Sequence, residues 1–289
     1  MGRVICAGHV NWDVTLRVDH LPAPDGEARI VSESGHGGGS AANVAVGLSG
    51  FGVSASVLGS VGDDERGRTA RTRLESEGVD CTHLVGTADA DTAVKYLIVD
   101  EGGQVIVLGG GGANESFGAD DLPGDALATA DHLHLTGQRP STAAELASRG
   151  NDAGVTVSFD PGRRIVERDF SAALARADLL FVNTREAEAA LATGAVRDEQ
   201  VLVVKRGSDG AEVCAPTGSW SHPGYEVDVV DTTGAGDAFA AGFVAALLDG
   251  ADHPRALAVA NAAGALATTV VGARPDLSWD AVREMAGTA

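Results

Sequence analysis

Short apolar segments alternate with longer amphipathic segments along most of the chain. In the second half, four apolar runs of strand length are separated by segments in which hydrophobic residues recur at helical spacing. Strands that alternate with helices are typical of a parallel sheet flanked by helices, so the pattern predicts an α/β fold. The expected strands of this sheet are residues 4–7, 55–58, 132–135, 155–159, 179–182 and 201–204.

Two predicted hairpins interrupt this alternation near the N-terminal half. One joins residues 14–20 to 28–33, and the other joins residues 92–99 to 104–108. Strands inserted together in this way could pair into a small sheet that covers the mouth of the main sheet as a lid. We therefore expect an α/β core of residues 1–13, 35–90 and 111–289, a lid of residues 14–34 and 91–110, and a glycine hinge at residues 109–112.

Acidic residues outnumber basic residues along the whole chain. The 289 residues include 41 Asp and Glu against 21 Lys and Arg, which gives a formal net charge of −20, and only two of the basic residues are lysines. This charge argues against nucleic acid and anionic membrane surfaces as partners. Surface acid spread along the chain, with arginine in place of lysine, predicts adaptation to high salt, where screening removes the self-repulsion.

The cysteines and the N-terminus indicate the expected compartment. Cys6, Cys81 and Cys214 are far apart and form no CxxC pair, so neither a disulfide framework nor a thiolate metal site is predicted. The chain begins on a strand pattern without an apolar signal region, and no run approaches the roughly 18 apolar residues that span a membrane. We therefore expect a cytoplasmic protein.

A glycine-rich stretch at residues 231–239 leads directly into an apolar helical pattern. The backbone N–H groups at a helix N-terminus lack intrahelical partners and form an anion site, which Gly234 and Gly236 would open to close approach by a ligand. Asp237 lies inside this site, where a simple phosphate loop would avoid negative charge. It is therefore a candidate to accept a proton from a hydroxyl group beside a transferring phosphoryl group. The alternative is an ordinary first-turn acid that the helix dipole favours.

Polar residues follow other predicted strands, where ligand sites of open α/β sheets lie. A carboxylate and two amides near the N-terminus could hold the hydroxyls of a polyol, although a solvated acid at a strand end would look the same. These candidates, with the glycines at the next loop-to-helix junction, are Asn11, Asp13, Gly38, Gly39 and Asn43.

Asn183 and Glu186 are i and i+3 on the opening turn of a predicted helix, so they project the same way. Their oxygens suit a hydrated Mg²⁺ beside nucleotide phosphates, but the same pair could be a helix cap. The stretch from Lys205 to Gly210 could wrap a nucleotide or could simply form a hairpin turn. His132 and His134 alternate on a strand with no third ligand at a matching spacing, which argues against a metal site.

Two rival nucleotide motifs fit poorly. The phosphate-loop pattern GxxxxGK[ST] is absent. A loose dinucleotide fingerprint runs from Gly37 to Ala42, with Asp63 at about the expected 20-residue spacing, but it follows an inserted hairpin instead of the first strand.

Two motifs together resemble those of the ribokinase family of carbohydrate kinases, also called the PfkB family. The N-terminal signature of that family is similar to Gly37-Gly-Gly-Ser-Ala-Ala-Asn43, and its C-terminal signature is matched by Asp231-Thr-Thr-Gly-Ala-Gly-Asp237-Ala-Phe. The resemblance covers almost the whole chain. It implies a ribokinase-like fold, transfer of the ATP γ-phosphoryl group to a sugar hydroxyl, and a homodimer formed through the lid.

The same resemblance implies a role for individual residues. Asp237 would be the catalytic base, with Gly234, Ala235 and Gly236 as the anion hole. Asn183 and Glu186 would organise Mg²⁺ through water, and Asp231 and Thr233 would bind an activating K⁺. The sugar would lie on Asn11, Asp13, Gly38, Gly39 and Asn43, and ATP on Asn183, Glu186, Lys205, Gly207, Ser208, Gly210 and Asn261.

Three departures leave the acceptor open. Ribokinases tend to have a glutamate where this chain has Thr136-Gly-Gln138, which puts ribose in doubt and makes Gln138 a substrate candidate. Residues 158–164 resemble the Asp-Pro-Asn-x-Arg element of fructokinases and 2-keto-3-deoxygluconate kinases, with Gly162 for the asparagine and Arg164 as the candidate contact. The lid arginine expected of a keto-acid kinase is missing from residues 109–112. Ribose, fructose, 2-keto-3-deoxygluconate, a sugar phosphate or a nucleoside remain possible acceptors, and a non-catalytic sugar or nucleotide sensor is the alternative class.

Overall fold

A nine-stranded sheet forms the body of the computed structural model, which describes residues 2–287. The central strands are parallel, and antiparallel pairing occurs only where β12 meets β11 and β13. The predicted α/β class is therefore confirmed. In spatial order the strands are β13 (Gly218–His222), β12 (Ala211–Ala215), β11 (Val201–Lys205), β10 (Leu179–Asn183), β9 (Thr156–Asp160), β8 (His132–Thr136), β1 (Arg3–Ala7), β4 (Ser54–Gly62) and β5 (Leu84–Thr87).

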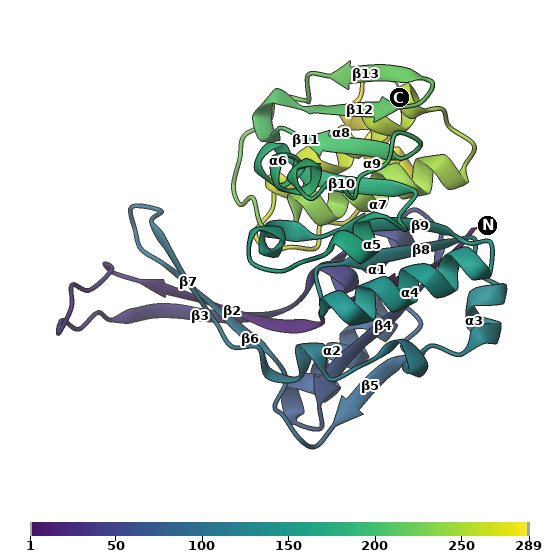
Figure 1. The fold of residues 1–289 in the computed structure, drawn as a ribbon. Coiled ribbons are helices and arrows are strands. Elements are labelled where there is room, and N and C mark those ends of the chain that lie inside the picture. The colour runs from purple at the N-terminus through teal and green to yellow at the C-terminus, as the bar shows by residue number, and fades with distance from the viewer. Residues whose placement is uncertain (1, 288–289) are drawn as a thin grey trace.

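Helices cover both faces of this sheet (Figure 1), and each face has its own hydrophobic cluster. One cluster includes α1 (Ser40–Gly50), α2 (Glu65–Ser76), α7 (Ala235–Leu248), α8 (His253–Thr268) and α9 (Trp279–Met285). The other includes α3 (Gly124–Ala128), α4 (Pro140–Asp152), α5 (Ser171–Leu174) and α6 (Thr184–Ala192). None of the described helices is long and apolar enough to cross a bilayer.

Helix α7 is buried from Ala238 to Ala246, where every residue is alanine, glycine, valine or phenylalanine. It packs against α8 and α1, and a Cβ on Gly242 would lie 2.9 Å from Ala263 Cβ, so the α7–α8 contact needs a glycine at this point. Phe243 lies at the helix centre and packs edge-on against Phe181 of β10. This burial fixes the position of the α7 N-terminus relative to the sheet.

A separate four-stranded sheet projects from the body as an arm, on the left in Figure 1. It consists, in spatial order, of β3 (Ile30–Gly38), β2 (Asn11–Val18), β6 (Val94–Val99) and β7 (Val105–Gly109). Each predicted hairpin is present, and β2 pairs in parallel with β6 to join the two. The small inserted sheet is thus confirmed.

The arm strands reach further toward the body than the sequence pattern indicates. Asn11 pairs with Gly38 and Asp13 with His36, so residues expected beyond the first strand of the core lie in β2 instead. The ladder continues because these polar side chains face a cleft and need no apolar contact. The 3₁₀ turn at Gly112–Glu115 begins where a glycine hinge is expected. Residue 1 and residues 288–289 of the expected core lie outside the described residues.

Candidate active site

Three adjacent parallel strands end in polar residues at the same edge of the sheet. Asn183 of β10 pairs with Lys205 of β11, and the next strand, β9, ends at Asp160. Lys205 Nζ lies 2.6 Å from Asp160 Oδ2, and both side chains are largely buried. Burial by itself would lower the pKa of Lys205, but the nearby Asp160 carboxylate raises it above its usual value, so the ammonium stays charged. A fixed positive charge therefore lies at this edge.

The N-terminus of α7 faces the same edge. Its N-cap, Gly234, has φ +76°, and a Cβ there would lie 2.4 Å from the carbonyl oxygen of Ala273, so only glycine fits. A Cβ on Gly236 would meet Lys205 Nζ at 3.5 Å, which shows that the ammonium lies beside the first turn. Unpaired N–H groups, the helix dipole and Lys205 thus form one anion-binding site.

Asp237 lies in this first turn and has a fixed partner. Its Oδ2 accepts a hydrogen bond of 2.8 Å from Asn43 Nδ2. Asn43 Oδ1 in turn accepts from Arg274 Nε, which dictates that the amide nitrogen of Asn43 faces Asp237. Burial raises the pKa of Asp237 to about 6, against the lowering effects of Asn43, Lys205 and Lys95. This value suits a general base near neutral pH.

A cleft of about 1210 Å³ lies on one side of the α7 N-terminus. Its walls come from β11 and the turn after it, the loop after β13, α7 and α8. Asn261 of α8 donates its amide to Leu257 O within the helix, so its side-chain oxygen has no partner among the described residues. The cleft brings together the predicted nucleotide contacts Lys205, Gly207, Ser208, Gly210 and Asn261.

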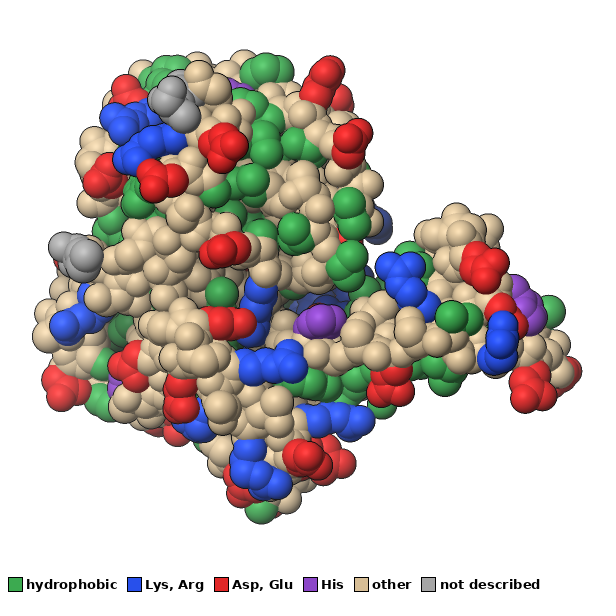
Figure 2. Space-filling view, turned by 180° about the vertical axis from the view of Figure 1, so that it is seen from behind, with side chains coloured by type: hydrophobic (Ala, Val, Ile, Leu, Met, Phe, Trp, Pro, Cys, Tyr) green, Lys and Arg blue, Asp and Glu red, His purple; other side chains and the backbone are tan. Residues whose placement is uncertain are grey.

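A second cleft of about 500 Å³ lies on the other side of the α7 N-terminus, where the arm joins the body. Figure 2 shows this junction as a hollow with basic and histidine side chains at its base. The predicted sugar contacts Asn11, Asp13, Gly39, Asn43 and Arg164 line it, together with Asp237 and Gly234. The two clefts thus meet at the first turn of α7.

Asp13 in this second cleft is buried, and its Oδ1 has no partner among the described residues. Burial raises the pKa of Asp13 despite the opposing charges of Lys95, Arg274 and His36. Gly38 does not line the cleft, but a Cβ on it would come within 2.3 Å of Asp13 Oδ2, so this glycine leaves room for the carboxylate. A buried oxygen with no protein partner indicates a hydroxyl group of a ligand.

Three predicted residues have other contacts. Gln138 is fully buried below the second cleft, does not line it, and donates Nε2 to Ala7 O. Asn183 and Glu186 form the capping box that was the alternative interpretation: Asn183 Oδ1 accepts from Glu186 N, and Glu186 Oε2 accepts from Asn183 N. Burial raises the pKa of Glu186, and the charge of Asp160 adds to this rise.

Asp231 and Thr233 lie in the loop before α7. Asp231 Oδ1 accepts from Thr233 N, and Asp231 Oδ2 accepts from Gly272 N at 2.9 Å. The side chain thus ties this loop to the loop that carries Ala273, against which Gly234 packs. Among residues 2–287 no group of three or more His, Cys, Asp or Glu side chains could hold a metal ion. His132 and His134 share the Ser158 hydroxyl inside the core.

Sequence reasoning missed several residues of the site. Asp160 lies in the second cleft and pairs with Lys205, and its signal was an Asp-Pro at a strand end. Asn114 also lines the cleft and donates to Asn11 Oδ1 at 2.6 Å. Arg274 lies against Gly37, where a Cβ would be 2.5 Å from Arg274 Nη1. These contacts join segments that are remote in the sequence, so no local pattern indicates them.

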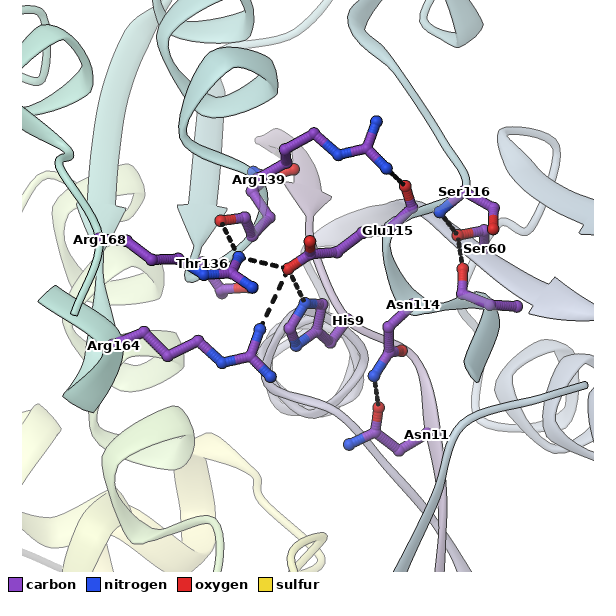
Figure 3. Close-up of polar contacts among 12 residues, drawn as sticks. His9, Asn11, Ser60, Asn114, Glu115, Ser116, Thr136, Arg139, Arg164 and Arg168 are labelled. Carbon is purple, nitrogen blue, oxygen red and sulfur yellow. Dashed lines mark hydrogen bonds and ion pairs between the residues drawn. The ribbon is translucent and has the colours of Figure 1, made fainter. Parts of the chain in front are cut away.

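A charged cluster around Glu115 lies beside the second cleft (Figure 3), and its members His9 and Arg164 line that cleft. Glu115 Oε1 lies 3.0 Å from Arg164 Nη1, 2.6 Å from Arg168 Nη1 and 3.4 Å from His9 Nε2. Arg139 donates to the Glu115 carbonyl oxygen. The His9 contact, followed by the Arg168 contact, lowers the pKa of Glu115 to about 2 despite partial burial. Of this cluster the sequence comparison with fructokinases indicated only Arg164.

The fold and the paired clefts define a class: a phosphotransferase that moves a phosphoryl group from a nucleotide to an alcohol. The sequence profile of the pfkB family carbohydrate kinases matches residues 1–280, and the chain belongs to that family. It is therefore an ATP-dependent carbohydrate kinase of this family.

Curated relatives and solved structures agree with this assignment. The chain is 56% identical over 98% of its length to an ATP-dependent ribose-1-phosphate kinase of Halopiger xanaduensis, 97% of which is covered. It is 29% identical to a nucleoside kinase of Methanothermobacter thermautotrophicus, over 86% of this chain and 84% of that one. Arabidopsis thaliana ribokinase in complex with ribose and ATP has the same fold, with a TM-score of 0.88 at 23% identity over 100% and 99% of the two chains.

Proposed function

We propose that this kinase phosphorylates ribose 1-phosphate at its C5 hydroxyl, with ATP as donor, to give ribose 1,5-bisphosphate and ADP. The observation that carries the proposal is the 56% identity, over nearly the full length of both chains, to a kinase of that specificity. C5 carries the only primary hydroxyl of ribose 1-phosphate. The second cleft, called the acceptor cleft from here on, supports this assignment because it has the polar lining that a sugar needs and basic side chains as well.

In the proposed reaction the C5 oxygen attacks the γ-phosphorus. A new P–O bond forms, the bond from the γ-phosphorus to the β,γ-bridging oxygen breaks, and ADP leaves with that oxygen. The C5 hydroxyl proton passes to the Asp237 carboxylate, whose pKa of about 6 keeps it ionised at neutral pH. The N–H group of Gly236 and the Lys205 ammonium stabilise the charge on the transferring group, whereas the N–H group of Ala235 donates to Thr232 O at 3.3 Å and holds the turn before α7.

Mg²⁺ is the expected companion of ATP, and it neutralises charge on the phosphates when bound. The residues fit an ion held mostly by phosphates and water. Glu186 uses one carboxylate oxygen in the capping box, and its other oxygen has no hydrogen bond within residues 2–287. We propose that Asn183 and Glu186 hold Mg²⁺ through water while they cap α6.

We propose that Asp231 and Thr233 form part of a K⁺ site and that the protein is adapted to high salt. The net charge of −20 with two lysines supports salt adaptation, and Figure 2 shows acidic side chains scattered over the surface. Activation by K⁺ itself can be separated from a general requirement for salt by assaying activity in KCl and in LiCl at equal ionic strength. A requirement for K⁺ itself predicts a higher kcat in KCl, whereas equal activity would contradict the K⁺ site.

A homodimer formed through the arm is also proposed. Exposed hydrophobic residues lie on its two edge strands: Ile30 and Val31 on β3, and Val105, Ile106, Val107 and Leu108 on β7. Exposed apolar edges promote association. Ile106→Asp with Leu108→Asp should yield a monomer by light scattering, whereas Leu191→Asp, an exposed leucine on α6, should not. A wild-type monomer would contradict the proposal.

We also propose that the protein is cytoplasmic and does not bind nucleic acid. The three free cysteines, two of them buried, support a reducing compartment, and the acidic surface disfavours nucleic acid.

The proposal is tested by an ADP-release screen at high KCl with ribose 1-phosphate, ribose, fructose, 2-keto-3-deoxygluconate, fructose phosphates and nucleosides. The highest kcat/KM is expected with ribose 1-phosphate, and ³¹P NMR of the product should show two phosphate esters. Activity only on nucleosides would move the chain to the nucleoside kinases, which the 29% identical relative makes the second candidate. No ADP release with any acceptor would favour a sensor.

A further inference from the structure

The Glu115 cluster carries more positive charge than its own carboxylate can balance. The Glu115 carboxylate is ionised and pairs with Arg164 and Arg168, while Arg139 donates to the Glu115 carbonyl oxygen nearby, so one negative charge lies among three positive ones, an excess of two. In a chain with a net charge of −20, such an excess beside a cleft indicates an anionic ligand.

Arg164 is the member of the cluster that can reach such a ligand. It lines the acceptor cleft together with its neighbour Arg163 and with His9. Its hydrogen bond to Glu115 uses Nη1, so the remaining N–H groups of the guanidinium are available (Figure 3). A guanidinium held in place by a carboxylate is preorganised to bind phosphate oxygens.

The position of Arg163 and Arg164 in the acceptor cleft fits the C1 phosphate of the proposed acceptor. Arg163 and Arg164 lie in the 3₁₀ turn Gly162–Val166 and Glu115 lies in the turn Gly112–Glu115, whereas Asp237 comes from α7. In the furanose ring of ribose 1-phosphate the ring oxygen joins C1 to C4, and C5 is attached to C4 outside the ring. A sugar whose C5 hydroxyl faces Asp237 can therefore present its C1 phosphate to another part of the cleft lining, where Arg164 lies.

We propose that Arg164, assisted by Arg163 and His9, binds the phosphate group at C1 of the acceptor and makes the cleft selective for a sugar phosphate over the free sugar. This inference rests on the proposed function. Glu115 is then a positioning residue, which holds the Arg164 guanidinium against the cleft.

The test compares Arg164→Met with the wild type, using ribose 1-phosphate and ribose as acceptors at saturating ATP. Loss of charge-assisted hydrogen bonds to phosphate should lower kcat/KM for ribose 1-phosphate by about 10- to 100-fold. The value for ribose should fall by a smaller factor, so that the preference for the phosphorylated sugar falls. Arg139→Met removes a charge from the same cluster outside the cleft and should preserve the preference.

A binding measurement separates selectivity from turnover and from folding. In an Asp237→Asn background, calorimetry should show weaker binding of ribose 1-phosphate after Arg164→Met, while unchanged ATP binding shows that the fold is intact. Wild-type turnover of ribose 1-phosphate with an unaltered preference in Arg164→Met would overturn the phosphate site and leave the proposed function standing. A wild type that neither binds nor phosphorylates ribose 1-phosphate would overturn both.

Discussion

The two clefts that meet at α7 are built in different ways. The larger cleft, which holds the predicted nucleotide contacts, is called the nucleotide cleft here. All residues that line it fall between Lys205 and Thr268, in one continuous part of the chain. The acceptor cleft draws on segments from His9 to Asp237, including both arm hairpins. A site made from neighbouring segments can keep its geometry through local structure, whereas a site made from distant segments depends on how the whole chain packs. We therefore expect the acceptor cleft to be the more sensitive of the two to substitutions elsewhere in the chain.

A buried ion pair joins the two clefts. Lys205 lines the nucleotide cleft and Asp160 lines the acceptor cleft, and their side chains are 2.6 Å apart. The first turn of α7 joins them a second time, since Ala235 and Gly236 face one cleft and Gly234 and Asp237 face the other. Substitutions in the Lys205–Asp160 pair or in the first turn of α7 should therefore affect both clefts.

Asp237→Asn should have the largest effect, because it removes the proposed base at the point where the clefts meet. We expect kcat to fall by about 10²- to 10⁴-fold, with ATP and acceptor binding retained by calorimetry. Asp249→Asn, at the C-cap of the same helix, is the matched control and should have near wild-type kcat. Turnover by Asp237→Asn at nearly the wild-type rate would show that Asp237 is not the base.

Lys205→Met should damage both clefts. It removes a donor to the transferring phosphoryl group, so kcat/KM for ATP should fall by roughly 10²-fold. It also leaves Asp160 buried without its partner, which should lower the free energy of unfolding by about 3 kcal/mol in denaturant titrations.

Adding Asp160→Asn to Lys205→Met should recover part of that stability but none of the activity. If the double variant is no more stable than the single one, the ion pair does not couple the clefts.

Gly234→Ala tests the close contact at the start of α7. The substitution would place a Cβ against Ala273 O, and the resulting shift of the helix N-terminus should reduce kcat by about 10²-fold. Gly250→Ala is a matched control, since Gly250 also has a positive φ but open space around it. It should cost about 1 kcal/mol of stability without loss of kcat. Equal kcat in the two variants would argue against a tight fit at Gly234.

The pH dependence should show the smallest and most specific effect. Since Asp237 must be ionised to accept a proton and its pKa is about 6, kcat/KM should fall about tenfold per pH unit below that value. Lys95 of the arm lowers the pKa of Asp237, so Lys95→Met should move the midpoint of this fall to higher pH. A midpoint that stays in place or moves to lower pH would show that the arm has no electrostatic influence on the base.

Much of the fold followed from local patterns. The alternation of strands and helices predicted the parallel sheet, and the Asp-Gly-rich and Pro-Gly-rich turns predicted both hairpins. The pattern did not predict that β2 begins at Asn11, because polar residues facing a cleft look like a loop in sequence. The resemblance to ribokinases made Gln138 a substrate candidate, and the packing directs this side chain inward to Ala7 O.

By itself the sequence determined the anion-binding turn of α7 and the acid within it, because residues in one helical turn have a fixed mutual geometry. It also determined that Asn183 and Glu186 could form a cap, since that motif is local. Only the tertiary structure decided which groups surround the acid. Asn43 and Asp237 are 194 positions apart and meet because α1 and α7 pack together. Contacts such as this one depend on the path of the whole chain, which no short stretch of sequence encodes.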